Sequence, residues 1–433
     1  KIIRTYQRIR EEMPESSPGE WYMCYPPFEK GWHVNKWEYM NGGVSSILAG
    51  DLALGAFEHG YESYGVDILR RLHKVAKKSD YELKGCYKGK MPEEPNRNFT
   101  ILDLKEHANT DLISGGGEDS PGWVGGEEAD FRNLPTGKQT LAGIPFHIIE
   151  PSRNNRRSCV AVNKDKDNQG EVTLPVDHKA NSLYLLHTMD SSGVAGTLYI
   201  RYADGSYHAR HINQGNEIGH FWYPEISESR KGIPSTKVAW KGPAKVVKDI
   251  GLYAFGMENP HSHKKIRSLE FINPQSSNWV IFGVTLSDGP HYFKPTIVST
   301  IPDHWGSAHV IKSVIEGLAG IRNAGLAFDK ARLSPRWEIA GVDKVRATAK
   351  YEPSGGYLSY IYSKKSLNNY ELEFTSNSRD TELQFLIPQN KKINSLRVNG
   401  ETKTHSIREI EESFYAIVRI NEVGVIKLEI GLV

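Results

Sequence analysis

Hydrophobic positions in the first 79 residues recur with the period of a helix. Apolar residues follow one another at spacings of three and four from Val44 onward and again from about Tyr64 to Lys78. Gly60 separates the two patterns. The sequence therefore predicts a helical hairpin in residues 1–79, preceded by a shorter helix.

The period changes to two between residues 140 and 300. Asp204-Gly205 lies between two alternating runs and is typical of a two-residue hairpin turn. Short strands separated by turn residues predict a β-sandwich of jelly-roll type. The expected strands are Ser158 to Val162, Ser182 to Thr188, Gly196 to Tyr202, Ser206 to Ile212, Lys237 to Trp240, Ile250 to Glu258, Ile266 to Ile272 and Trp279 to Leu286.

Helical spacing returns over residues 307–323, and alternation follows from residue 331 to 433. Asn399-Gly400 marks a hairpin in the last segment. The expected strands there are Tyr357 to Ser363, Tyr370 to Phe374, Glu382 to Ile387, Phe414 to Ile420 and Val425 to Ile430. We therefore expect helical hairpins (1–79), a long Gly/Pro-rich connection (80–139), an inserted sandwich (140–300), a returning helix (301–330) and a C-terminal β-sandwich (331–433).

Composition narrows the classes of partner. A chain of 433 residues is long enough for several domains, and its formal charge of +2 is not concentrated in a basic stripe. We therefore expect neither a nucleic-acid partner nor membrane insertion. Cys24, Cys86 and Cys159 are too widely spaced to predict a metal site or a disulfide framework. The first residues form a helical pattern without an N-cap, which predicts that the chain starts inside an element of a longer protein.

The segment from Trp32 to Gly43 is the strongest candidate for a functional site. It combines three aromatic residues, a histidine and a carboxylate in a loop that leads into a helix. Such a set suits a sugar, because aromatic rings stack on pyranose faces while polar groups bind hydroxyls or transfer protons. The candidate catalytic residues are Glu38 and His33, and the candidate substrate-binding residues are Trp21, Trp32, Trp37, Asn35, Asn41, His304 and Trp305.

Each candidate also has a structural interpretation. Glu38 can be a helix-entry carboxylate bound by backbone N–H groups, His33 a structural histidine, and the tryptophans core residues beneath a long loop. Glu58 and Glu62 flank the next turn and are expected to be solvated. No metal or other cofactor is expected. Calcium is the one alternative left open, for a group of acids in the glycine-rich connection: Glu118, Asp119, Glu127, Glu128 and Asp130.

Three stretches carry a resemblance to a known group of enzymes. They are Asn41-Gly42-Gly43-Val44, the run Ile315 to Arg322 with Leu333 to Trp337, and Leu134 to Thr140 with Gly143 to Phe146. These resemble the late-barrel loop, the last barrel helix and the entry to a galactose-binding-like sandwich in bacterial six-hairpin (α/α)6-barrel glycoside hydrolases of the α-L-rhamnosidase type. The resemblance implies a multidomain α and β fold with partial (α/α) toroid helices, an inserted jelly-roll sandwich and a C-terminal β-sandwich.

The same resemblance implies a function and a location. It predicts a secreted or periplasmic bacterial protein that acts on plant, algal or microbial polysaccharide or oligosaccharide as the C-terminal portion of a glycoside hydrolase, with the N-terminal part of the same protein as a partner. A full barrel needs about twelve helices, whereas about four are expected here. Two alternatives stay open: a non-catalytic carbohydrate-binding or structural module, and a polysaccharide lyase. The loop offers only Lys36 to neutralise a uronate, which favours a hydrolase or a binding module over the lyase.

Overall fold

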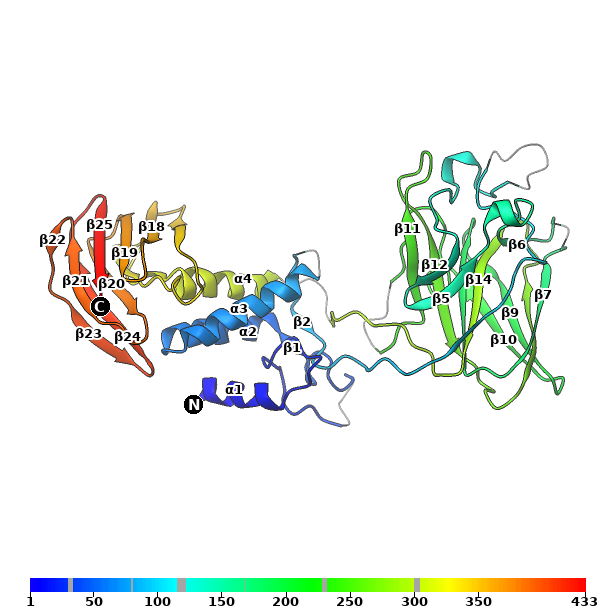
Figure 1. Cartoon of the computed structure of the whole chain (residues 1–433), viewed down its shortest axis with the longest axis horizontal. Helices are drawn as coiled ribbons and strands as arrows, with labels where there is room; N and C mark the ends of the chain where they lie inside the picture. Colours follow the sequence, from blue (N-terminus) through cyan, green and yellow to red (C-terminus); the bar gives the residue numbers. More distant parts are fainter. Residues whose placement is uncertain (30–33, 79–80, 115–121, 167, 228–231, 300–303) are drawn as a thin grey trace. The chain divides into compact units, whose positions relative to one another are not determined.

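The computed structural model describes residues 1–29, 34–78, 81–114, 122–166, 168–227, 232–299 and 304–433. The chain divides into two compact units (Figure 1). A discontinuous unit comprises residues 1–91 and 297–433, and an inserted unit comprises residues 92–296. Both are rich in β-sheet, and each is described by itself.

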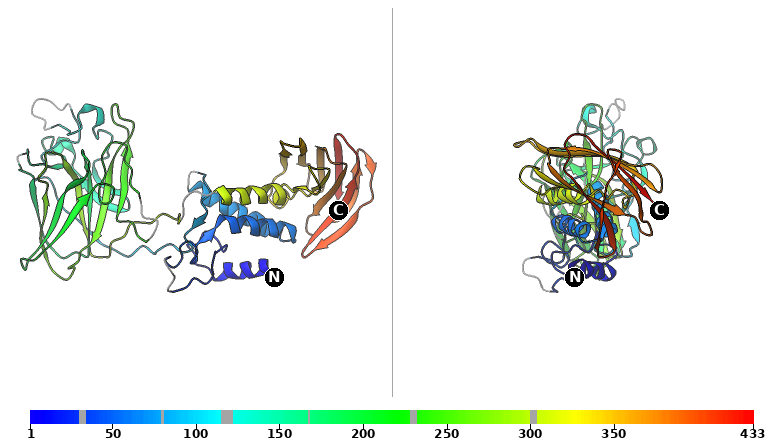
Figure 2. Two further views of the ribbon diagram at one scale, coloured as in Figure 1. Left: turned by 180° about the vertical axis from the view of Figure 1, so that it is seen from behind. Right: turned by 90° about the vertical axis from the view of Figure 1, so that its left-hand side faces the viewer.

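Helices form the first part of the discontinuous unit, as the 3.6-residue period predicts. They are α1 (Ile2–Glu12), α2 (Ser46–Glu58), α3 (Glu62–Lys77) and α4 (His304–Lys312), the last continued by a π-helical segment, η3 (Ser313–Leu318). A short pairing of β1 (Val44–Ser45) with β2 (Cys86–Tyr87) precedes α2. Helices α2, α3 and α4 lie side by side (Figures 1 and 2). The expected packing of the returning helix against the first hairpin is confirmed.

Helices α2 and α4 run in the same direction and approach closely. A Cβ atom added at Gly50 would lie 2.6 Å from the backbone carbon of His309, and one added at Gly306 would collide with the Ser46 side chain. The returning helix ends earlier than expected, because Gly320 adopts a φ of 68° and the chain then enters a strand. The described helices form no closed toroid.

The C-terminal sandwich completes the discontinuous unit. Its two sheets share one hydrophobic core. The five-stranded sheet has the order β15 (Ile321–Asn323), β16 (Lys330–Leu333), β20 (Asp380–Ile387), β24 (Ser413–Ile420) and β23 (Ser406–Ile410). The six-stranded sheet has the order β17 (Lys344–Tyr351), β18 (Gly356–Lys364), β19 (Asn369–Ser376), β25 (Ile426–Leu432), β21 (Ile393–Val398) and β22 (Glu401–Thr402). Asn399 and Gly400 both have positive φ in the turn between β21 and β22, as their sequence predicts.

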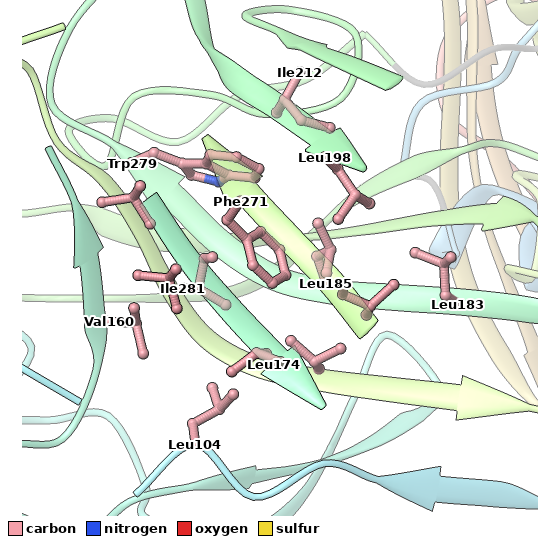
Figure 3. Close-up of a cluster of buried hydrophobic side chains, with 14 of the residues drawn as sticks. Leu104, Val160, Leu174, Leu183, Leu185, Leu198, Ile212, Phe271, Trp279 and Ile281 are labelled. Carbon is pink, nitrogen blue, oxygen red and sulfur yellow. The ribbon is translucent and has the colours of Figure 1, made fainter. Parts of the chain in front are cut away.

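The inserted unit is a β-sandwich of two antiparallel sheets. One has the order β10 (Tyr207–Asn213), β9 (Val194–Tyr202), β13 (Ile266–Ile272) and β7 (Glu171–His178). The other has the order β11 (Thr236–Gly242), β12 (Ile250–Glu258), β8 (Ser182–Met189), β14 (Trp279–Ser287) and β3 (Phe99–Ile101), with β6 (Val160–Val162) also on β14. Apolar residues of both sheets, such as Leu198, Phe271, Leu185 and Ile281, form the core between them (Figure 3).

The connection at residues 80–139 was expected to be unpacked, but part of it is packed into the inserted unit. It is largely irregular, with a 3₁₀ turn, η1 (Glu127–Ala129), yet Leu112, Phe131 and Leu134 are buried in the inserted unit. Sequence periodicity also missed the hairpin of β4 (Gly137–Leu141) and β5 (Ile144–Ile148), which a second 3₁₀ turn, η2 (Pro151–Arg153), follows. The turn at Asp204-Gly205 has three residues rather than two, because Tyr202 N–H donates to the Ser206 carbonyl.

Candidate functional site

Two aromatic residues in the loop before α2 have left-handed backbone conformations. Trp37 has a φ of 69° and Tyr39 a φ of 40°. Positive φ is unfavourable for a bulky L-residue and persists only where surrounding contacts determine it, and such residues cluster at ligand-binding and catalytic sites. Contacts with surrounding residues must therefore hold the backbone of this loop in its left-handed conformation.

The first anchor is a buried ion pair. Glu38 lies between the two strained residues and is 8% exposed. Its Oε1 is 3.1 Å from Lys88 Nζ, and its Oε2 accepts a hydrogen bond of 3.1 Å from Asn35 Nδ2. Lys88 follows β2, so the pairing of β2 with β1 brings it under the loop. Sequence analysis missed Lys88, because a lysine 50 residues away carries no local signal.

The second anchor is Asn41. Its Oδ1 accepts from the Phe28 N–H at 2.8 Å, and its Nδ2 donates to the Phe28 carbonyl at 3.1 Å and to that of Val34 at 3.5 Å. The Asn41 amide is therefore occupied in joining distant parts of the loop. The expectation that it binds a sugar hydroxyl is replaced by this bracing role.

Aromatic rings surround the strained backbone. Trp37 is half-buried against Tyr22 and Tyr25, with ring centroids at 5.9 and 6.4 Å. Burial raises the pKa of Tyr22 to about 12. The more accessible rings are those of Phe28, which is 65% exposed, and Tyr39, which is 43% exposed. Tyr39 belongs to the predicted segment but was not among the predicted binding residues, and Phe28 precedes that segment in the sequence.

Trp21 lies in the hydrophobic core and not at the surface. Its ring is fully buried, with the Arg71 guanidinium 4.6 Å from the ring centroid. Arg71 Nη2 is 2.9 Å from Oε1 of the buried Glu20, which also accepts from the Tyr64 hydroxyl. Burial alone raises the pKa of the Glu20 carboxyl, but the hydrogen bonds and charge of Arg71 outweigh it and lower the pKa below its usual range. Trp21 thus offers no ring face to a sugar in this structure.

The four other predicted site residues are Trp32, His33, His304 and Trp305. Trp32 and His33 lie outside the described residues. His304 and Trp305 begin α4, and the contact of Gly306 with Ser46 places that end of α4 beside the start of α2. Trp305 is 74% exposed. The helix termini therefore bring His304 and Trp305 to the end of α2 that the loop enters.

Glu58 and Glu62 are less solvated than expected. Glu62 is 3% exposed and accepts hydrogen bonds from the Tyr415 hydroxyl and, at 2.6 Å, from Ser413 Oγ. Glu58 pairs with Arg322 and, at 3.3 Å, with Arg332. Both carboxylates therefore join the hairpin to the C-terminal strands, a long-range pairing that local patterns cannot indicate.

Two of the acids considered for calcium, Asp130 and Glu127, form ion pairs with protein side chains. Asp130 Oδ2 is 2.7 Å from Arg132 Nη2, and Glu127 Oε2 is 2.6 Å from Lys245 Nζ. Glu118 and Asp119 fall outside the described residues. Within the described ranges, no cluster of three or more His, Cys, Asp or Glu side chains has a geometry that holds a metal ion.

Comparison of the chain with known proteins assigns it to no family. No model of a known protein family matches the chain, and a search of curated proteins finds no significant match. In the part of the chain that is described, no helix combines the length and apolarity needed to cross a membrane.

Proposed function

We propose that the chain is a carbohydrate-active protein, part of a glycoside hydrolase, and that its saccharide site is built on residues 28–43. The observation that carries this proposal is the strained backbone at Trp37 and Tyr39, held by the buried Glu38–Lys88 pair. Strain of this kind costs about 1–3 kcal/mol per residue, and a loop retains it where presentation of its side chains matters.

The side chains that the loop presents indicate the ligand class. Phe28 and Tyr39 expose ring faces, and the exposed Asn35 and half-buried Lys36 lie beside them in the loop. Aromatic faces next to amide and ammonium donors suit a pyranose, whose ring has apolar faces and an equatorial belt of hydroxyls. The parallel course of α2 and α4, with α3 between them in sequence, supports the further proposal of a six-hairpin arrangement, because hairpins placed around a ring have every second helix parallel.

One observation favours the alternative, a carbohydrate-binding module without catalysis. Both oxygens of Glu38 have protein partners, Lys88 and Asn35. A general acid or base must reach the scissile bond, directly or through one water. Glu38 is therefore assigned to holding the loop, and its catalytic assignment requires the pair to open when the saccharide binds.

The test separates binding from folding. Titration calorimetry of the chain with neutral plant and algal oligosaccharides measures the dissociation constant. Tyr39→Gly removes the ring, which is worth about 0.5–1.5 kcal/mol of contact or up to roughly tenfold in affinity. The free energy of unfolding stays within about 1 kcal/mol, since relief of the positive φ offsets the entropy that glycine loses on folding.

A matched control is Trp222→Ala, which removes an exposed ring from the inserted unit. It leaves affinity at the loop unchanged. The proposal is rejected if no oligosaccharide binds the chain, or if Tyr39→Gly and Trp222→Ala alter affinity equally.

A further inference from the structure

The outer face of the four-stranded sheet in the inserted unit carries a second polar and aromatic surface. In β9, Leu198, Ile200 and Tyr202 point into the core, so Tyr199 and Arg201 point outward. Strand register places Tyr207 opposite Arg201 and Glu270 opposite Tyr199. We call the outward-facing residues Tyr199, Arg201, Tyr207, Arg267 and Glu270 the sheet-face cluster.

Arg201 is fixed at the centre of this cluster. Its guanidinium lies 5.1 Å from the Tyr199 ring centroid and 4.9 Å from that of Tyr207, while its Nε is 2.8 Å from Glu270 Oε2. The side chain is 36% exposed. A guanidinium held through Nε and two rings is pre-organised, so little side-chain entropy is lost when a ligand binds its remaining N–H groups.

A hollow of about 520 Å³ adjoins Arg201 on this face. Its lining includes Arg267, Glu270, Thr173 and Asp177. Arg267 stands at a β-bulge: Ile266 and Ser268 pair with Tyr202 and Arg201, so β13 has one residue more than β9 at this point. Bulges redirect side chains and are frequent beside functional sites.

The charges around the hollow do not cancel. Glu270 pairs with Arg201, and Asp177 Oδ1 is 3.0 Å from Lys265 Nζ. Arg267 is exposed and has no ion-pair or hydrogen-bond partner among the residues that the structure describes. The guanidinium group of Arg267, an arginine fork, therefore remains available to a ligand. Guanidinium groups bind carboxylates through two parallel hydrogen bonds.

We infer that the sheet-face cluster is a binding site for an acidic saccharide, a sugar chain whose pyranose ring carries a carboxylate. Arg267 and the free N–H groups of Arg201 bind the carboxylate, Thr173 binds hydroxyls, and Tyr207, which is 56% exposed, supplies a ring face. This site is separate from residues 28–43 and does not rest on the function proposed for them.

The experiment is calorimetry of the whole chain with trigalacturonate at low ionic strength. Trigalacturonate binds, and Arg267→Ala weakens it by about tenfold or more, the loss expected for a hydrogen-bonded charge contact. Tyr207→Ala weakens it less, and raising the salt concentration weakens binding to the wild-type chain. Arg157→Ala, which removes an exposed arginine from the same unit, leaves the affinity unchanged.

A neutral trisaccharide distinguishes the ligand classes. Galactotriose binds this site at least about tenfold more weakly than trigalacturonate, because it cannot engage the arginine fork. Equal affinity of the Tyr39→Gly chain for the two trimers overturns the inference, as does trigalacturonate binding that Arg267→Ala leaves intact. Tyr39→Gly does not change trigalacturonate binding here, so failure of the loop proposal and failure of this one give different results.

Discussion

At the scale of single residues, the Glu38–Lys88 pair is the most consequential contact, because two opposite charges are buried together. Removing one partner of a buried pair leaves an uncompensated charge, which typically costs about 3–5 kcal/mol. We expect Lys88→Met to destabilise the discontinuous unit by about 2–4 kcal/mol in urea unfolding.

The control for Lys88→Met is Lys77→Met, at the exposed end of α3. It changes stability by less than about 0.5 kcal/mol. The double variant Glu38→Gln with Lys88→Met recovers part of the loss, since no buried charge remains. Equal stability of Lys88→Met and the wild-type chain contradicts the anchoring role.

His187 gives the inserted unit a defined dependence on pH. Burial lowers the pKa of His187 to about 3. Trp279 Nε1 donates to its Nδ1 at 3.1 Å, so its Nε2 carries the proton and donates to the Glu217 carbonyl at 3.0 Å. In the unfolded chain a histidine titrates near pH 6.5. The unfolded state therefore binds more protons below that pH.

The contribution of neutral His187 to the free energy of unfolding is fully present above about pH 6.5. It is lost as the pH falls toward 3, at up to about 1.4 kcal/mol per pH unit. Imidazole NMR shifts at pH 5 should show His187 neutral with the proton on Nε2. A midpoint above pH 5 in the folded chain contradicts this assignment.

At the scale of elements, two glycines of α2 provide a matched test of helix packing. Replacing glycine by alanine inside a helix normally stabilises it by about 1 kcal/mol. A Cβ atom at Gly55 meets no atom within 4 Å, whereas one at Gly50 would lie 2.6 Å from His309 backbone. We expect Gly55→Ala to raise stability by about 0.5–1 kcal/mol and Gly50→Ala to lower it by about 1–3 kcal/mol. Thermal unfolding of both variants measures the difference, and a gain for Gly50→Ala would show that α2 and α4 pack more loosely.

Elements with regular patterns could be predicted from the sequence. Strands β12 and β13 have the expected bounds, because their buried and turn residues are distinctive. Strand β7 was missed, since Pro175 interrupts it, and a proline is tolerated there because β7 is an edge strand. The hairpin of β4 and β5 turns at Ala142-Gly143, where alanine at positive φ gives no turn signal.

The candidate site was only partly predictable for a related reason. Glu38 and its loop stand out by composition, but the partners that define them come from elsewhere in the chain. Lys88 arrives through β2, and α4 approaches through glycine contacts. Long-range pairing of this kind depends on the tertiary fold and leaves no periodic trace in the sequence.

At the scale of the whole molecule, the question is whether this chain cleaves a saccharide by itself. Hydrolysis generally needs two carboxyl groups about 5–10 Å apart across the bond. Among the described residues of the discontinuous unit, Glu20, Glu38 and Glu62 are buried, and each is bound to a cation or to hydroxyl groups of the protein.

We therefore expect the 433-residue chain to bind oligosaccharide without hydrolysing it. Incubation with aryl glycosides and with plant and algal oligosaccharides, followed by product analysis, measures this directly. The control is Glu38→Gln, which preserves the shape of the side chain and removes its charge. Turnover by the wild-type chain that Glu38→Gln abolishes without loss of oligosaccharide affinity would show that the Glu38–Lys88 pair opens on binding and that both carboxylates lie within these residues. Binding without turnover, weakened in Tyr39→Gly, supports a site that recognises the sugar here and receives its second carboxylate from outside these residues.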